Sequence, residues 1–449
     1  MNSMSEAAAT ATAPGTETDV GSYFVANYPP FSTWTTDAVA GAAQPALATP
    51  GAKDVPLGLY LHIPFCRKRC HFCYFRVYTD KNAAEVQSYL DVLGREWELY
   101  AEQPAIAGRP LDFIYFGGGT PSFLSVRQLR GLVDRLSAVS PWSDASEITF
   151  ECEPGTLTEP KLRAIRDMGV TRLSLGVEHF DDHVLELNGR AHRSAEIFRA
   201  YEFARSIDFP QINIDLIAGM LGETDEKWRD AVSETVALDP DSVTIYQMEL
   251  PFNTTISSDR LHGNGQFQET VAPWATKRRW VDEAFAALER AGYTVGSAYT
   301  AVKHPGRTSF VYRDRLWQGA DLAGLGVASF GHVNGVHMQN LDSWSAYAQA
   351  IEEGRIPLNR AYRPTDEERL IRELVLQLKL GSIRPPYFRE KYGVDVRERF
   401  TDPFASLASD GYLADSSPER VRLSREGLLR VDSLLPRFFL PAHTDIRYT

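Results

Sequence analysis

The sequence contains few cysteines, no excess of basic charge and no long apolar run. Only four of its 449 residues are cysteines, which excludes a secreted domain held by a disulfide framework. Lys and Arg number 47 against 59 Asp and Glu, a formal net charge of −12, which argues against a general nucleic-acid binder. No stretch of about 18 apolar residues is present to span a bilayer, and the start lacks the pattern of a signal peptide. We therefore expect a cytoplasmic protein without a nucleic-acid or membrane partner.

Composition and periodicity divide the chain into three parts. Residues 1–50 are rich in Ala, Thr, Pro and Gly and are expected to form a flexible tail, except for an aromatic cluster between Tyr23 and Trp34. That cluster either docks on the folded body, over a substrate pocket, or is a surface strap without function. Residues 51–300 alternate strands with helices. Residues 301–449 are mostly helical and include a run resembling a winged helix, which in an acidic chain favours a packing module or substrate lid over DNA binding.

Six apolar segments are predicted as strands, with helical patterns between them. The strands are Leu57–Ile63, Leu111–Phe116, Glu147–Cys152, Arg172–Gly176, Ile212–Ala218 and Ser242–Gln247. The first helix begins near Asn82, and later helices include Val126–Val139, Glu159–Met168, Ser194–Ser206, Glu226–Leu238, Ser343–Glu353 and Asp366–Leu380. This alternation predicts an α/β fold with a parallel sheet and right-handed crossovers. Six βα units are too few for a closed eightfold barrel, so we expect a partial (β/α)6 TIM-type barrel with its site at the carboxyl ends of the strands.

Three cysteines, Cys66, Cys70 and Cys73, follow the first strand within eight residues. Three thiolates on a cubane iron–sulfur cluster leave one iron without a protein ligand. S-adenosylmethionine (SAM) chelates such an iron through its amino and carboxylate groups, and one electron then cleaves its sulfonium to give a 5′-deoxyadenosyl radical. Structural zinc is the alternative, but it requires a fourth ligand, and His71 is poorly placed for that role. Cys152 lies in a later strand and is expected to pack as a small buried hydrophobe.

Glycine and polar residues in or directly after the later predicted strands are further candidates for ligand binding. The glycine run Gly117–Gly119 allows close approach of a ligand and is a candidate site for the methionine part of SAM. Alternation places Glu151 and Glu153 on one face of the third strand, where a carboxylate can bind a ribose diol or an amino group. Asp215 lies in an apolar strand, and it either pairs with Arg190 or each side chain binds part of a ligand.

Arg67, Lys68 and Arg69 lie between the cysteines of the triplet. Their positive charge would favour thiolates and a reduced, negatively charged cluster. Alternatively, these three residues are solvated parts of the loop.

These motifs resemble a known group of enzymes. The segments Tyr60–Cys66, Gly117–Pro121 and Asn213–Ile217, with the cysteine triplet, resemble radical SAM enzymes, and more narrowly the branch of oxygen-independent coproporphyrinogen III oxidase. The resemblance covers residues 57 to 435. It implies that Cys66, Cys70 and Cys73 bind a 4Fe–4S cluster and that a flavodoxin or ferredoxin supplies electrons. It further implies contacts to a cluster-bound SAM from Tyr60, Gly118 and Glu151, and to a second SAM from Phe72, Gly119, Thr120, Glu178, Arg190, Asp215 and Gln247.

Three activities occur in that branch, and this chain lacks marker residues of two of them. The decarboxylating oxidase carries an extra cysteine where this chain has Phe75, and the haem chaperones carry a motif of which Thr308–Arg313 keeps only Tyr312. The resemblance therefore favours class C methyltransferases, which attach a SAM-derived methyl or methylene carbon to an unsaturated carbon of a natural product, sometimes toward a cyclopropane. Glu178 and Tyr299 are candidate general bases, with a separate partner enzyme for ring closure as the alternative. The aromatic N-terminal cluster and Tyr299, Tyr312 and Trp317 indicate either a pocket for a planar, unsaturated small-molecule substrate or ordinary core packing.

Overall fold

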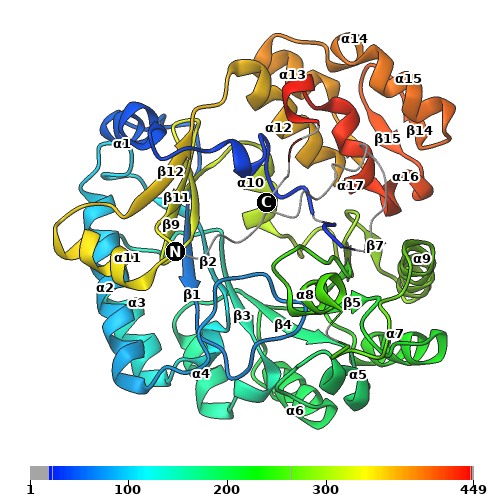
Figure 1. Ribbon diagram of the computed structural model, residues 1–449, viewed down its shortest axis with the longest axis horizontal. Helices are drawn as coiled ribbons and strands as arrows, with labels where there is room; N and C mark the ends of the chain where they lie inside the picture. The colour runs from blue at the N-terminus through cyan, green and yellow to red at the C-terminus, as the bar shows by residue number, and fades with distance from the viewer. Residues whose placement is uncertain (1–19, 23, 264, 445, 447–449) are drawn as a thin grey trace.

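A single twelve-stranded sheet forms the body of the molecule in the computed structural model, which describes residues 20–22, 24–263, 265–444 and 446 (Figure 1). Tyr23 of the aromatic cluster lies outside the described residues. The strands are β1 (Leu57–Ile63), β2 (Leu111–Gly118), β3 (Glu147–Cys152), β4 (Arg172–Glu178), β5 (Gln211–Ala218), β6 (Ser242–Gln247), β7 (Thr294–Val295), β8 (Thr300–Val302), β9 (Asp321–Leu325), β10 (Phe330–Val333), β11 (Val336–Asn340) and β12 (Leu358–Tyr362).

The strands β1 to β6 pair in parallel and in chain order, as the sequence predicts for a partial barrel. Each predicted strand is present, and β4 extends two residues beyond its expected end to include Glu178. The antiparallel strands β8 and β7 continue the sheet beyond β6. On the other side, β9 pairs in parallel with β1, and β10, β11 and β12 follow in antiparallel order. The sheet therefore extends to residue 362, although the sequence analysis starts a mostly helical part at residue 301.

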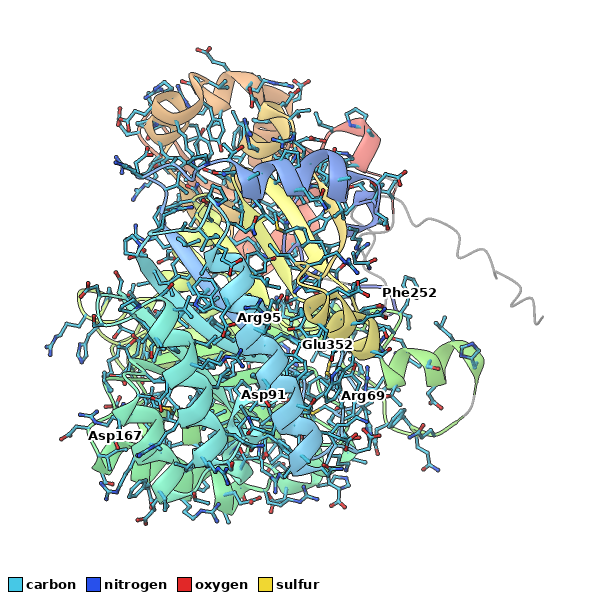
Figure 2. The ribbon with its side chains drawn as sticks, turned by 90° about the vertical axis from the view of Figure 1, so that its left-hand side faces the viewer. Arg69, Asp91, Arg95, Asp167, Phe252 and Glu352 are labelled. Carbon is cyan, nitrogen blue, oxygen red and sulfur yellow. The ribbon has the colours of Figure 1, made fainter. Side chains whose placement is uncertain are left out.

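The helices of this part of the chain cover the outer face of the sheet, except that Val311–Trp317 packs against Tyr60 and Tyr115 on its inner face. They are α1 (Gln44–Ala48), α2 (Ala83–Ala101), α3 (Val126–Val139), α4 (Glu159–Asp167), α5 (Asp182–Leu187), α6 (Ser194–Ser206), α7 (Asp225–Leu238), α8 (Thr255–His262), α9 (Trp274–Arg290), α10 (Val311–Trp317) and α11 (Trp344–Glu352). Helix α2 shows how the sequence sets an element: Asn82 accepts hydrogen bonds from the first-turn amides, and Glu85 accepts one from the Asn82 amide. Asp91 and Arg95 lie on its solvent face (Figure 2). No helix among the described residues has the length and apolar character needed to cross a bilayer.

The C-terminal domain packs around a second hydrophobic core, which also includes Val25, Tyr28 and Ala298 from earlier in the chain. Its helices are α12 (Asp366–Leu378), α13 (Pro385–Tyr392), α14 (Val396–Arg399), α15 (Thr401–Ser409), α16 (Arg425–Leu429) and α17 (Val431–Leu434), and its three-stranded sheet consists of β13 (Ser382–Ile383), β14 (Leu413–Ser416) and β15 (Val421–Leu423). These elements form the orange and red part of Figure 1. The mostly helical C-terminal domain predicted from the sequence is thereby confirmed.

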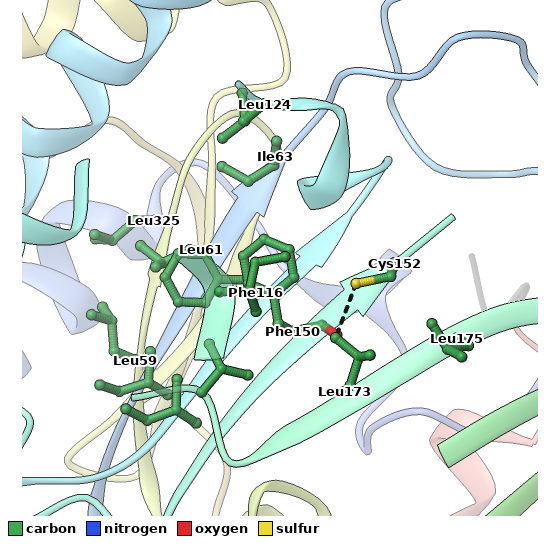
Figure 3. Packing of buried hydrophobic residues seen from close by; sticks show 14 of the residues in the cluster. Leu59, Leu61, Ile63, Phe116, Leu124, Phe150, Cys152, Leu173, Leu175 and Leu325 are labelled. Atoms are coloured by element: carbon green, nitrogen blue, oxygen red, sulfur yellow. Dashed lines mark hydrogen bonds between the residues drawn. The ribbon is translucent and has the colours of Figure 1, made fainter. Parts of the chain in front are cut away.

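The barrel core lies between the sheet and its outer helices. Leu61, Phe116 and Phe150 from three adjacent strands pack there, and Cys152 lies among them with its thiol directed at the Phe150 carbonyl oxygen, 3.8 Å away (Figure 3). The prediction that Cys152 packs as a small buried hydrophobe is confirmed.

The N-terminal segment of residues 20–48 packs on the body. Val39–Ala43 form a short π-helix ahead of α1, and Thr35 pairs with Ala361 of β12. The Val25 amide donates to Asp432 of α17 at 3.0 Å, and the Tyr28 hydroxyl lies 2.8 Å from Nδ1 of His443. This segment, called the N-terminal strap below, therefore contacts both the large sheet and the C-terminal domain.

Candidate active site

The cysteine triplet lies on a loop at the carboxyl end of β1. Two backbone hydrogen bonds close the base of this loop: the Cys66 amide donates to the Tyr78 carbonyl at 3.0 Å, and the Tyr78 amide donates to Pro64 at 2.7 Å. Cys66, Cys70 and Cys73 are all free thiols of intermediate exposure. The loop therefore presents three sulfurs where a partial barrel carries its site, as predicted.

Neighbouring polar groups are directed at two of the sulfurs. The Thr120 hydroxyl donates to Cys66 Sγ at 3.4 Å, and Arg190 Nη1 donates to Cys70 Sγ at 3.3 Å. Burial raises the pKa of the Cys66 thiol to about 12 and that of Cys73 to about 11, so the basic residues of the loop do not keep these thiols ionised by themselves. The charge of bound iron would do so.

The donor set fits a cluster better than a single ion. No group of three or more His, Cys, Asp or Glu side chains among the described residues is arranged to hold one metal ion. In a cubane each thiolate binds a different iron, so the three sulfurs need to surround a space and do not need to meet at one point. Thr120 and Arg190 donate to the sulfurs in the way that outer hydrogen bonds tune such clusters. The zinc alternative is therefore not supported by the geometry.

Glu153 fixes the cysteine loop to the end of β3. Its carboxylate accepts two hydrogen bonds from Arg67, from Nε at 3.0 Å and Nη2 at 2.9 Å, and a third from His192 Nδ1 at 3.0 Å. Burial opposes ionisation, but these donors lower the pKa of Glu153 to about 2. Arg67 is thus a structural clamp, and Glu153 is a positioning residue whose role the sequence analysis did not identify.

Neighbouring atoms approach the backbone of Gly117–Gly119 closely, which is possible only because glycine has no side chain. Gly118 has φ +108°, and a Cβ on it would lie 2.5 Å from Nδ1 of His62. A Cβ on Gly119 would lie 2.9 Å from the backbone carbonyl oxygen of Ile63. The Gly118 amide donates to Glu151 at 3.2 Å, so the run also orients that carboxylate.

A cavity of about 340 Å³ brings the predicted site residues together. The predicted residues that line it are Cys66, Cys70, Cys73, Phe72, Gly118, Gly119, Thr120, Glu151, Glu178, Arg190, Asp215 and Gln247. Tyr60 and Tyr299 are not among the lining residues. Tyr60 lies beside the cavity with its ring stacked on Tyr115, and the Tyr299 hydroxyl donates to Asp432 of the C-terminal domain.

Buried carboxylates give the cavity its electrostatic character. Burial raises the pKa of Glu151 to about 7 and that of Glu178 to about 7, and it also raises the pKa of Asp215. Glu151 is oriented by the Tyr115 hydroxyl at 2.5 Å. Such carboxylates suit the amino and hydroxyl groups and the sulfonium charge of SAM.

Asp215 and Arg190 do not form the structural pair considered from the sequence. Arg190 contacts Cys70, the Gly176 carbonyl and Glu178, the last at 3.4 Å. Asp215 instead accepts from Ser174 and Asn213, each at 2.8 Å. The pairing alternative is wrong, and each of the two side chains faces the cavity separately.

Several other lining residues were not predicted, among them Arg172 and Glu249, whereas Phe24 belongs to the aromatic cluster that the sequence places on the body or over a substrate pocket. Phe24 of the N-terminal strap packs edge-on against Tyr246 at 5.6 Å, so the strap covers one side of the cavity. Every second residue of β4, from Arg172 to Glu178, lines the cavity. This alternation could have predicted Arg172 from the sequence.

The chain matches known proteins over nearly its whole length. Residues 60–234 match the family model described as the radical SAM superfamily. The chain is 31% identical to the haem chaperone HemW of Bacillus subtilis over 82% of its own length and 96% of the relative's. It is 27% identical to the oxygen-independent coproporphyrinogen III oxidase of Escherichia coli, with 84% of each chain covered. The solved structure of that oxidase, described as a radical SAM enzyme, matches with a TM-score of 0.80, 25% identity and coverage of 92% of this chain and 96% of the other.

Proposed function

The chain belongs to the radical SAM superfamily, in the family of HemW and the oxygen-independent coproporphyrinogen III oxidases, and we propose that it is an oxidative decarboxylase of the oxidase type. The likeness to the oxidase structure over both the barrel and the C-terminal domain carries this proposal. The sequence motifs favour methyl transfer, whereas the named relatives favour the decarboxylating oxidase and the haem chaperone. The family uses a 4Fe–4S cluster and SAM.

The chain's residues have separable roles in this proposal. Cys66, Cys70 and Cys73 would hold the cluster, and the bound cluster and SAM would supply a 5′-deoxyadenosyl radical. Arg190 holds Cys70, and its contact with Glu178 joins the cluster end of the cavity to the proposed site of a second SAM. Phe24 and Phe310 line the cavity with apolar surface that excludes water.

The overall change in the substrate balances as follows. A propionate arm loses one hydrogen atom to the radical and its carboxylate as CO₂, and a vinyl group remains. One electron passes to an external one-electron acceptor. Coproporphyrinogen III, a reduced tetrapyrrole with four such arms, is the substrate to test first.

Methyl or methylene transfer remains the second candidate because of one residue. Phe75 stands where the oxidase carries its extra cysteine; it is 43% exposed and packs on Tyr74 at 4.5 Å between ring centres. That reaction needs a general base, and Glu178 lines the cavity, whereas the Tyr299 hydroxyl already donates to Asp432. In a chaperone role, Tyr312 would be the retained marker, but it packs against Tyr115 at 4.3 Å inside the molecule.

Product analysis separates these functions. The reconstituted protein is incubated anaerobically with a reductant, methyl-labelled SAM and coproporphyrinogen III, with Cys73→Ala as the control without a complete cluster site. We expect 5′-deoxyadenosine and CO₂ from the wild-type protein only. Formation of S-adenosylhomocysteine with label in an added unsaturated acceptor, and no CO₂, would replace this proposal by methyl transfer. Stoichiometric haem binding with no SAM cleavage would replace it by the chaperone role.

A further inference from the structure

Arg172 is a buried cation of the cavity wall, and two of its guanidinium nitrogens form no hydrogen bond with the described part of the chain. It is the first residue of β4, lines the cavity and is 2% exposed. Its Nε and Nη1 atoms are buried and have no hydrogen-bond partner among the described residues. The guanidinium lies over the ring of Phe310, 4.1 Å from its centre, which holds the flat group in one plane.

The nearby carboxylates are already engaged with other donors. Asp215 accepts from Asn213 through Oδ1 and from Ser174 through Oδ2. Glu151 accepts from Tyr115 through Oε1 and from the Gly118 amide through Oε2. Removal of a cation from water costs several kcal/mol unless an anion or hydrogen bonds compensate it. The charge of Arg172 opposes the rise that burial causes in the pKa of Asp215 and Glu151, but its Nε and Nη1 atoms form no hydrogen bond with either carboxylate. These two N–H groups therefore remain for a group that enters the cavity.

We propose that Arg172 is a carboxylate-binding site for a ligand in the cavity. Its guanidinium fork matches the two oxygens of a carboxylate. The inward positions of β4 run from Arg172 through Ser174 to Gly176, whose carbonyl binds Arg190 beneath Cys70. At roughly 3.3 Å per residue, Arg172 and Gly176 are about 13 Å apart along the strand. A ligand held at Arg172 is thus extended toward the cysteine triplet.

Two ligands carry this chemistry: an acid arm of the substrate, and the methionine carboxylate of the proposed second SAM, since the first SAM would use its carboxylate to chelate the cluster iron. The first source rests on the proposed function, because it assumes a substrate with several carboxylates. The site itself does not, since it requires only a carboxylate in the cavity.

The test measures binding and not turnover. Arg172→Gln removes the charge and Arg172→Lys keeps it without the fork. Arg163→Gln is the matched control, because Arg163 is an exposed arginine over the ring of Phe203 at 5.0 Å. The probes are coproporphyrin III, a stable tetracarboxylic acid, and its tetramethyl ester, both titrated by fluorescence, and radiolabelled SAM, measured by equilibrium dialysis on cluster-loaded protein.

We expect Arg172→Gln to raise the Kd of one carboxylate probe about tenfold or more, Arg172→Lys to raise it less, and Arg163→Gln to leave it unchanged. A loss confined to coproporphyrin, with ester binding unaffected, identifies the substrate arm; a loss confined to SAM identifies the methionine carboxylate. Unchanged affinity for both probes overturns the proposal. If Arg172→Gln does not fold, two other results together overturn the proposal. The wild-type protein would bind the acid and the ester with equal affinity, and Arg172→Lys would bind SAM as the wild-type protein does. A binding loss without any CO₂ production would refute the proposed function and leave this site standing.

Discussion

Replacing Glu153 by Gln should release the cysteine loop from the barrel. The carboxylate holds Arg67 by two hydrogen bonds and His192 by a third. A pKa of about 2 in place of the ordinary 4.5 corresponds to about 3 kcal/mol in favour of the carboxylate in the folded protein. Gln keeps one acceptor but has no charge and presents an NH₂ group to one of the donors. Most of that stabilisation should therefore be lost.

Hydrogen exchange on the cluster-free protein measures this loss locally. The amides of Cys66 and Tyr78 close the base of the loop, and an opening free energy lower by about 3 kcal/mol makes them exchange roughly a hundredfold faster at pH 7. The native pKa is lowered, so the contribution of Glu153 is complete above pH 4.5 and is lost as the pH falls toward 2. The difference in melting temperature between wild type and variant should shrink over that range.

The matched control is Glu186→Gln. Glu186 is 68% exposed and pairs with Arg193 at 3.5 Å, so its removal should cost at most about 1 kcal/mol. If the backbone amides of residues 64–78 exchange at the same rate in Glu153→Gln and Glu186→Gln, the hydrogen bonds between Glu153 and Arg67 do not hold the cysteine loop.

Three further outcomes are expected. Cys73→Ala should lower bound iron and abolish SAM cleavage, whereas Cys152→Ala should retain the iron; equal iron loss in both would contradict the assignment of ligands. Gly119→Ala, whose Cβ would meet the backbone of Ile63 at 2.9 Å, should weaken SAM binding in equilibrium dialysis at least about fivefold, since the cost of overpacking is about 1–3 kcal/mol. Burial raises the pKa of Glu96 to about 8, so the folded chain keeps a proton that the unfolded chain loses near pH 4.5. The wild-type melting temperature should therefore fall relative to that of Glu96→Gln as the pH rises from 5 to 8, and parallel curves would show that Glu96 titrates normally.

The barrel and its cysteine triplet were predictable because their signals are local. Each strand from β1 to β6 is a short apolar run, and the three cysteines follow the first strand directly. The strand β9 gave no such signal: Asp321–Leu325 is short and contains a glycine, and its pairing with β1 and β10 makes it a strand. Residue spacing alone does not show that a distant segment completes the sheet.

Side-chain partners were less predictable than side-chain positions. Alternation correctly placed Glu151 inward, but the partner of Arg190 proved to be Cys70, 120 residues earlier in the chain. The sequence predicts Tyr299 as a candidate base, although its hydroxyl donates a hydrogen bond to Asp432 of the C-terminal domain. Arg190 and Cys70 meet only after the barrel has folded, and Tyr299 and Asp432 meet only after the C-terminal domain has packed on it.

Because β1 pairs with both β2 and β9, it gains its second neighbouring strand only late in synthesis. As the chain leaves the ribosome, β1 and its cysteine loop emerge early, but β9 follows only after all six parallel strands have been made. Until then β1 is an open edge that invites pairing with other chains. If the cluster were inserted before β9 is made, the cysteine loop would still be attached to a β1 strand that is paired on one side only. A chain cut at residue 300 should for the same reason aggregate and not yield an isolated barrel.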